Sequence, residues 1–535
     1  MADLSSAHCI LLAVHWASEA NIKALHAFTP TRQDAFDPEL ILRILLTYLP
    51  ESVEPASYVT YVNEVYTRTY LEQHDNVPFD PSPVKDISDS VAQKRVKKLH
   101  LLELVPPEFP PHAPHDCLTR FLCHRAHRID TETGLLNLIP QLLTPFLERS
   151  EYLRTWFIAV VLPITRFGYE YYPGKDLPLS MEEFAKVEGA KGIEILLSRA
   201  TYTRHEITSA TDSEGTVGRD LRGLVGPWMY GHTERKRRRL EKTAGEGQRT
   251  AAGGKRISLS GVSEEDKTGH DWEHAFKWMV HQAAQNFALV TNAIEEWDGP
   301  SDVDLGGYDD GHRYLGDELL PKLERQYAQA AFACCYAAET DTSETVDGAH
   351  GILVRLAELL DFEPPPDLAA SVEQLPKVDR HAALLRESNS TQHLEPDFLL
   401  RPEHPLTTPK LETYMLLQMF VYSAYQLAGL GHSISVVNVA KLRFFSEEDE
   451  QMALMQKILH SLAQKGKRDD AEWANDRNKF LWLWDWGIDK EEGALRGAGI
   501  FGNIERTYFE KEILKVLVGT SCESPVPSME KLSIS

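Results

Sequence analysis

The stretch "DPELILRILLTYLP", residues 37–50, carries the pattern on which the fold prediction rests. Asp37 can cap a helix, Pro38 fits the first helical position, and Glu39 places negative charge near the positive end of the helix dipole. The apolar residues that follow recur at the spacing of one helical face; they are Leu40, Ile41, Ile44, Leu45 and Tyr48. The stretch therefore predicts an amphipathic helix that ends before Pro50.

The segment before this helix, "LSSAHCILLAVHWASEANIKALHAF" (residues 4–28), contains an apolar run close to the first residue. A secretory signal needs a basic segment ahead of such a run, but the only charge there is Asp3. After the run, apolar residues recur at helical spacing with charged residues between them. We therefore predict one amphipathic helix over residues 5–28, rather than a signal peptide or a membrane anchor.

Helix signals of the same kind occur along the whole chain. Ser180 and Glu183 match a capping box before a helix that is predicted to end near residue 200. Residues 433–445 are the best strand candidate, but a lone strand has nothing to pair with, so a helix is predicted there as well. Further helix starts are predicted at Glu54-Pro55, Ser343, Thr408-Pro409 and Ser446.

Two other apolar runs, residues 156–165 and 415–430, resemble membrane segments at first sight. A membrane-spanning helix needs roughly 20 consecutive apolar residues, and both runs are shorter than that. The first run also contains Pro163, and the second contains Gln418 and Gln426. We predict two buried helices and no transmembrane segment.

The recurring helices and short turns define the predicted architecture. A chain of 535 residues is too long for one simple core, and stacked helix pairs can bury a continuous core at this length. We predict an all-α fold, an elongated α-solenoid of stacked antiparallel helix hairpins. Residues 4–230 form an N-terminal helical solenoid and residues 270–518 continue it. Residues 231–269 are predicted to be a flexible charged insertion, and residues 519–535 a polar C-terminal tail.

The charge and cysteine content limit the classes of function. The formal net charge is −24, so general binding of nucleic acid is not expected, because phosphate backbones would be repelled. The six cysteines form no CxxC pair, which indicates reduced thiols in a cytosolic setting. The basic run "ERKRRRLEK" (residues 234–242) lies in the predicted insertion and is interpreted as a solvated loop. An acidic lipid surface, an acidic partner or an import receptor is the alternative contact for this run.

The segment "HDWEH", residues 270–274, matches an inverted zinc-protease pattern. His270 and His274 lie four residues apart, as two zinc ligands on one helix do, and Glu273 could act as a base. No third ligand is evident, and the aromatic residues in and after the segment follow an amphipathic pattern. The start of an ordinary amphipathic helix is therefore the favoured interpretation.

The segment "GAGIFG", residues 497–502, fits the glycine pattern of dinucleotide-binding loops. Such a loop needs a strand before it, whereas the preceding residues look helical, so we predict a helix turn or cap. The chain shows no set of nucleophile, base and orienting group. We therefore expect no enzyme activity, no catalytic, cofactor-binding or metal-binding residue, no cofactor and no small-molecule substrate.

Several stretches resemble one protein family. The sequence "AHCILLAVHWASEANIKALHAFTPTR" followed by "DPELILRILLTYLPESVEP" resembles the opening of fungal proteins of the Sec-thirty-nine family. The stretches "GLLNLIPQLLTPFLERSEYLRTWFIAVVLPITRFGYEYYP" (residues 134–173) and "FLWLWDWG" (residues 480–487) fit the same family. The resemblance runs from about residue 4 to about residue 518. It involves helix-packing sequence, so it carries over no site residue.

The resemblance implies a scaffold subunit of the Dsl tethering complex, related to the neuroblastoma-amplified sequence protein of the animal NRZ complex. Such tethers capture vesicles that return from the Golgi to the endoplasmic reticulum (ER). The expected partners are a Dsl-type tether subunit and a Use-type ER SNARE. The expected location is the cytoplasm, peripherally on the cytosolic face of the ER membrane and through these partners.

Two alternatives stay open. The first is an α-solenoid scaffold of another complex, such as one of nuclear transport or the proteasome lid, and the second, more remote one is a zinc hydrolase built on "HDWEH". The chain ends in "SCESPVPSMEKLSIS", where fungal relatives usually continue through more helices. From this we expect a short gene model or an N-terminal fragment.

Overall fold

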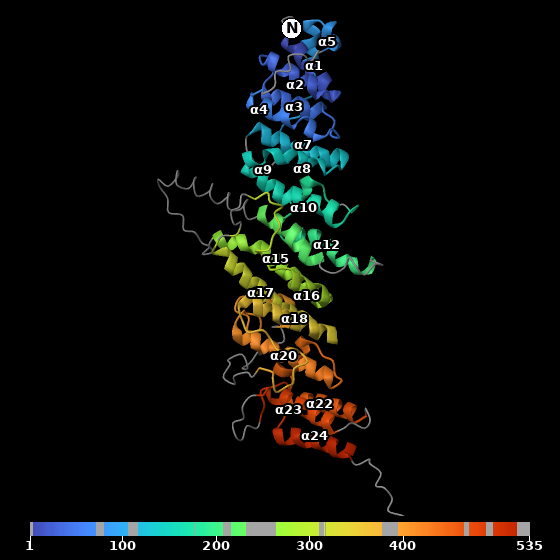
Figure 1. The fold of residues 1–535 in the computed structure, drawn as a ribbon, viewed down its shortest axis with the longest axis vertical. Coiled ribbons are helices and arrows are strands. Elements are labelled where there is room, and N and C mark those ends of the chain that lie inside the picture. The colour runs from blue at the N-terminus through green and yellow to red at the C-terminus, as the bar shows by residue number, and fades with distance from the viewer. Residues whose placement is uncertain are drawn as a thin grey trace, which may run out of the picture. The chain divides into compact units, whose positions relative to one another are not determined.

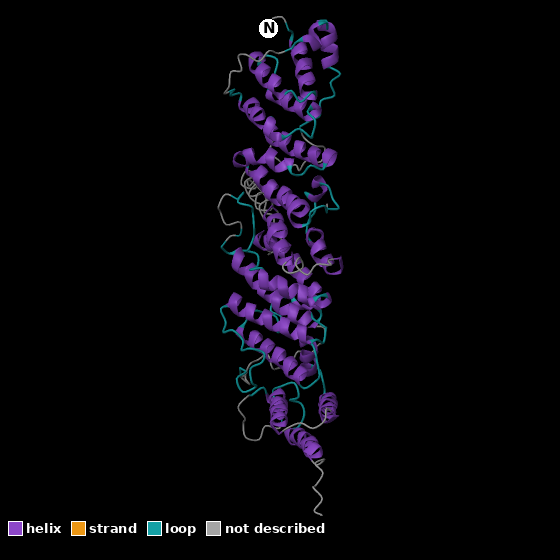
Figure 2. Ribbon diagram, turned by 45° about the vertical axis from the view of Figure 1, so that its right-hand side comes forward, coloured by secondary structure: helices purple, strands orange, loops and turns teal. Residues whose placement is uncertain are grey.

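The structure is a computed structural model that describes most of the chain. The described residues are 4–70, 80–104, 116–175, 177–206, 216–231, 264–309, 315, 317–376, 394–464, 470–487 and 496–521. Every regular element in these ranges is a helix, and no strand occurs in them (Figure 2). The predicted all-α solenoid class is thereby confirmed. The predicted insertion and tail fall mainly on residues 232–263 and 522–535, which lie outside the described residues, so those boundaries stay predictions.

The chain divides into two compact units. The first takes the described residues within Met1–Leu196, Arg222–Leu259 and Val303–Tyr314. The second takes those within Leu197–Leu221, Ser260–Asp302 and Leu315–Ser535. Each unit consists of helices that pack against their neighbours along the chain (Figure 1).

The first unit is built from short helices. Its α-helices are α1 (Ser6–Ser18), α2 (Ile22–Phe28), α3 (Pro38–Tyr48), α4 (Val59–Thr67), α5 (Ser82–Lys85), α6 (Asp89–Val96), α7 (Cys117–Thr133), α8 (Leu138–Leu143), α9 (Glu151–Trp156), α10 (Leu162–Thr165), α11 (Met181–Phe184) and the first part of α12 (Ala190–Glu206). The 3-10 helices are η1 (Thr29–Arg32), η2 (Pro55–Ser57) and η3 (Thr144–Arg149), and the π-helices are η4 (Phe157–Val161), η5 (Arg166–Tyr171) and η6 (Leu221–Val225), whose first residue belongs to the second unit. Contacts join α1 to α3 and α6, and α3 to α7.

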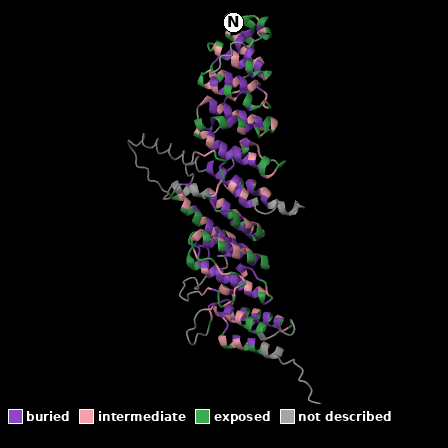
Figure 3. Cartoon of the chain, viewed as in Figure 1, coloured by how far each residue is buried: buried purple, intermediate pink, exposed green. Residues whose placement is uncertain are grey.

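The helices of the second unit are longer on average. They are α13 (Thr216–Asp220), α15 (Glu264–Gln285), α16 (Phe287–Glu296), α17 (Leu319–Ala337), α18 (Ser343–Leu360), α19 (Pro396–Leu399), α20 (Leu411–Gly429), α21 (Val436–Phe444), α22 (Glu448–Gln464), α23 (Asp470–Asp485) and α24 (Arg506–Ser521). Helix α15 packs on α17, α16 on α18, and α18 on α20. In both units the buried residues lie where helices face each other, and exposed residues lie on the outer sides (Figure 3).

Several helix predictions are confirmed by these bounds. Helix α3 begins at Pro38, and the Asp37 carboxylate accepts a hydrogen bond from the backbone of Glu39 at 3.3 Å. Helices α18, α20 and α22 begin within a few residues of the predicted starts, and residues 436–444 are helical. The apolar run 156–165 lies inside the buried helical stretch from α9 to η5. No helix among the described residues is long and apolar enough to cross a membrane.

The prediction of one helix over residues 5–28 is wrong. Helix α1 ends at Ser18, and Ala20 takes a left-handed conformation with φ of 56°. The side chain of Asn21 then caps α2, accepting a hydrogen bond from the backbone of Ala24 at 3.1 Å. The cap signal at Asn21 was available in the sequence, but an alanine at a left-handed position has no such signal.

Two further helix predictions need correction. Ser180 and Glu183 do form a capping box, but α11 ends at Phe184, and α12 begins only at Ala190, after Gly189 with φ of 61°. The helix predicted from Glu54 starts as the short 3-10 helix η2, and α4 begins at Val59. In both places a helix begins where the sequence predicts, but this first helix is shorter than predicted.

Candidate functional site

The segment "HDWEH" lies in α15, and its described side chains contribute to packing. Trp272 is 1% exposed and stacks on Trp297 with 5.7 Å between ring centroids. The Glu273 carboxylate lies 3.5 Å from the Gln326 amide nitrogen, which donates to it. The side chain of His270 lies outside the described residues. Within the described part of the chain, no group of three or more His, Cys, Asp or Glu residues is placed to hold a metal ion.

The "GAGIFG" segment is a turn packed on the end of α23. The backbone N–H of Gly499 donates to the carbonyl of Trp484 at 2.9 Å, and that of Phe501 donates to the carbonyl of Leu483 at 3.3 Å. A Cβ atom on Gly497 would lie 2.0 Å from the Trp484 carbonyl oxygen, so the close approach requires glycine. These amides satisfy carbonyls at a helix C-terminus. The predicted helix cap is confirmed.

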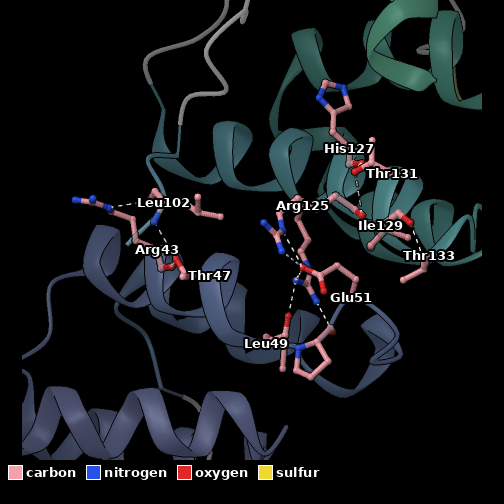
Figure 4. A network of polar contacts seen from close by, with 12 residues as sticks. Arg43, Thr47, Leu49, Glu51, Leu102, Arg125, His127, Ile129, Thr131 and Thr133 are labelled. Atoms are coloured by element: carbon pink, nitrogen blue, oxygen red, sulfur yellow. Dashed lines mark hydrogen bonds and ion pairs between the residues drawn. The ribbon is translucent and has the colours of Figure 1, made fainter. Parts of the chain in front are cut away.

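A buried arginine joins α3 to α7 in the first unit. Arg125 is 0% exposed and donates to the carbonyls of Leu49 at 2.7 Å and Pro50 at 2.6 Å (Figure 4). Its Nη1 lies 3.4 Å from the Glu51 carboxylate, which also pairs with Arg128 at 2.6 Å. The guanidinium thus satisfies carbonyls just after the end of α3, where a positive charge also suits the helix dipole.

His127 lies two residues further along α7. It is half-buried and packs edge-on against Trp156, with 5.5 Å between ring centroids. Both ring nitrogens are shielded from solvent, and neither makes a hydrogen bond. Burial lowers the pKa of His127 to about 4, so the ring is neutral at physiological pH.

A second buried arginine holds the acidic loop that follows α16. Arg166 in η5 donates to the carbonyl of Gly223 at 3.0 Å and to that of Asp304 at 2.6 Å. It also pairs with the Asp304 carboxylate at 2.8 Å. Tyr308 packs on Phe157 with 4.6 Å between ring centroids. The loop over residues 303–309 is therefore part of the packing of the first unit.

A groove on the second unit is the candidate docking site. Its lining comes from α15, α17, α19 and the segment between α19 and α20, and its volume is about 480 Å³. Phe276 and Pro409 are buried lining residues, and Leu400 is half-buried. Pockets of a few hundred cubic ångströms are typical of ligand and peptide anchor sites. No sequence motif marks this groove, because its lining residues lie far apart along the chain.

The comparisons with known proteins identify one family. The family model described as Secretory pathway protein Sec39 matches residues 10–526, which is essentially the whole chain. No curated protein gives a significant sequence match. The resemblance carried by the helix-packing stretches near the N-terminus is thereby confirmed. This all-helical chain belongs to the Sec39 family of secretory-pathway proteins.

Proposed function

We propose that this protein is a vesicle-tethering scaffold without enzyme activity that acts in Golgi-to-ER retrograde transport. It binds a Dsl-type tether subunit and a Use-type ER SNARE, and these partners hold it peripherally on the cytosolic face of the ER membrane. The observation that carries the proposal is the family match over residues 10–526. Family membership gives the secretory pathway, and the tethering role is our inference.

The side chains of the described residues mainly pack helices against each other, which supports the role of a scaffold. Most large apolar side chains of the described residues are buried, and the exposed residues lie on the outer sides of the helices (Figure 3). The two chemistry-like motifs, "HDWEH" and "GAGIFG", contribute to packing and to a helix cap. Repeat-helix proteins of this kind act by presenting surface to helical or extended partners.

The first test is affinity purification from ER membranes. The tagged full chain is incubated with detergent-solubilised ER membranes, and bound proteins are quantified by mass spectrometry against a tag-only control. We expect enrichment of the Use-type SNARE and the Dsl-type subunit. Recovery of importins or proteasome-lid subunits in their place would contradict the proposal and favour the other scaffold class.

The remote zinc-hydrolase alternative has a separate test. Elemental analysis of the purified chain measures zinc per molecule, for the natural protein and for the variant carrying His270→Ala and His274→Ala. We expect no stoichiometric zinc in either protein. One zinc per chain that disappears in the double variant would favour the zinc-hydrolase alternative.

A further inference from the structure

We propose that the groove on the second unit binds an acidic, extended peptide segment of a partner protein, with an apolar side chain of the peptide seated on the groove floor. This inference deepens the proposed function, because it assigns a chemistry to one partner-binding surface. The inference rests on three lining cations that make no ion pair with another described residue, on the apolar floor and on the fixed backbone of one wall. One of these cations, Arg401, packs over the Phe398 ring with 3.7 Å to its centroid.

Several cationic side chains that line the groove form no ion pair with a carboxylate of the described residues. Lys277 on α15 and Arg401 after α19 are exposed and make no ion pair with another described residue. Arg325 on α17 makes one hydrogen bond, to the carbonyl of Pro409 at 3.4 Å, and its other guanidinium donors carry no described ion pair. Arginine and lysine in such positions bind carboxylates well.

Three carboxylates line the groove, and each has a partner. Glu273 accepts a hydrogen bond from the Gln326 amide at 3.5 Å. Asp397 lies 3.2 Å from a ring nitrogen of His281, and Glu403 pairs with Lys410 at 3.3 Å. Neither His281 nor Lys410 is among the lining residues. The four lining cations, which are Lys277, Lys322, Arg325 and Arg401, exceed the three lining carboxylates by one formal charge, on a chain whose formal net charge is −24. A local excess of positive charge attracts an acidic ligand.

The floor and one wall are suited to an extended chain. Phe276 is 2% exposed, and Pro409 and the half-buried Leu400 add apolar surface beside it. The Gln329 amide donates to the Arg401 carbonyl at 2.8 Å, and the Thr407 hydroxyl donates to the Leu399 carbonyl at 2.5 Å. The Gln329 amide also donates to the Leu399 carbonyl and to the Thr407 hydroxyl, both at 3.3 Å. These bonds from α17 hold residues 399–407 in place, so less conformational entropy is lost when a peptide binds.

The arrangement favours a peptide over a lipid headgroup. Lys277, Arg325 and Arg401 come from three different elements and stand around an apolar floor. A phosphate group requires donors that converge on one point, and the apolar floor offers such a group nothing. A peptide with spaced carboxylates and one large apolar side chain uses both features.

The test is selection from a random-peptide display library on the immobilised full chain, followed by fluorescence anisotropy with the enriched peptides. The variant K277E/R401E reverses two groove charges at exposed positions. The control variant K457E reverses an exposed lysine of α22 in the same unit, outside the groove lining. Circular dichroism checks that the variants keep the helical content of the natural chain.

We expect enriched peptides with several Asp or Glu residues around an apolar one. Their affinity should fall roughly tenfold or more in K277E/R401E and stay unchanged in K457E. Peptides with Lys in place of Asp and Glu should bind K277E/R401E better than the natural chain. Tighter binding of the basic peptides by K277E/R401E cannot result from a loss of folding.

Three results would overturn the inference. They are a lack of enrichment, enrichment of neutral or basic peptides, and binding that K277E/R401E leaves unchanged. Binding of phosphatidylcholine vesicles that contain a phosphoinositide, lost in K277E/R401E and without any acidic peptide enriched, would replace the peptide with a lipid. The selection uses only the purified chain, so its failure leaves the result of the ER-membrane purification intact.

Discussion

Arg125 is fully buried and donates hydrogen bonds to two backbone carbonyls that follow α3. We expect Arg125→Met to lower the stability of the α3–α7 contact by about 3 kcal/mol, because buried acceptors lose their donor. Hydrogen–deuterium exchange of the α3 and α7 peptides measures the opening free energy. Arg128→Met is the matched control on the same helix, because Arg128 is partly exposed and its ion pair contributes less. Equal losses in both variants would contradict this role of Arg125.

The lowered pKa of His127 predicts that the stability of the first unit around α7 falls in acid. The unfolded chain takes up a proton at this position near pH 6.5, whereas in the folded state the pKa of His127 is about 4. Stability that is present at pH 7 is therefore lost as the pH falls through this window. The loss between pH 7 and pH 5 is about 2 kcal/mol.

The variant His127→Phe isolates this effect, since it keeps a ring against Trp156 and cannot be protonated. Exchange protection of the α7 peptides is measured at both pH values, after correction for the intrinsic exchange rate. The natural chain should lose more protection than the variant. The same loss in both proteins would show that His127 does not set the acid sensitivity.

At the scale of elements, close helix packing in the first unit depends on glycine. A Cβ atom on Gly231 would lie 2.0 Å from the Cβ atom of Ala159 in η4. Ala159 has no longer side chain that can move aside, so Gly231→Ala must separate the two helical segments. We expect a loss of roughly 1–3 kcal/mol, measured as a lower denaturation midpoint.

Gly168→Ala is the control for this substitution. Gly168 lies in η5, and a Cβ atom there would have only one neighbour within 4 Å, the carbonyl oxygen of Lys175 at 3.9 Å. It should leave the midpoint unchanged or raise it slightly. The double variant Gly231→Ala with Ala159→Gly should recover part of the loss. No loss in Gly231→Ala would contradict the tight packing.

Local signals explain which elements were predictable from the sequence. Helices α3, α18 and α22 have their caps and apolar faces within one short stretch, so their patterns predict them. The break at Ala20 and the π-helices η4 to η6 depend on packing against other segments, and no nearby residue signals them. The contact of Arg166 with Asp304 joins residues far apart along the chain, and one sequence alone does not indicate it.

The candidate site was less predictable than the fold. The sequence suggested two motifs, and both received their structural interpretation because neighbouring residues were apolar or helical. The groove was missed, since Lys277, Arg325 and Arg401 look like ordinary solvated charges until α15, α17 and the segment after α19 lie together. Charge and spacing along the chain do not report which helices become neighbours.

For the chain as a whole, the proposed function depends on where its apolar and polar side chains lie. Most large apolar side chains of the described residues pack helices within each unit, and we propose that the exposed surface docks protein partners of the secretory pathway, the pathway that the family match gives. No described helix is long and apolar enough to cross a membrane. The ER association through bound proteins is part of the proposed function.

The most direct measurement of this claim is co-sedimentation of the purified full chain with ER microsomes before and after the microsomes are stripped of cytosolic protein domains by trypsin. Protease inhibitor is added before the chain, so that only the membranes are digested. We expect saturable binding to intact microsomes and loss of that binding after stripping. Undiminished binding to stripped microsomes, or equal binding to protein-free vesicles of ER lipids, would contradict it.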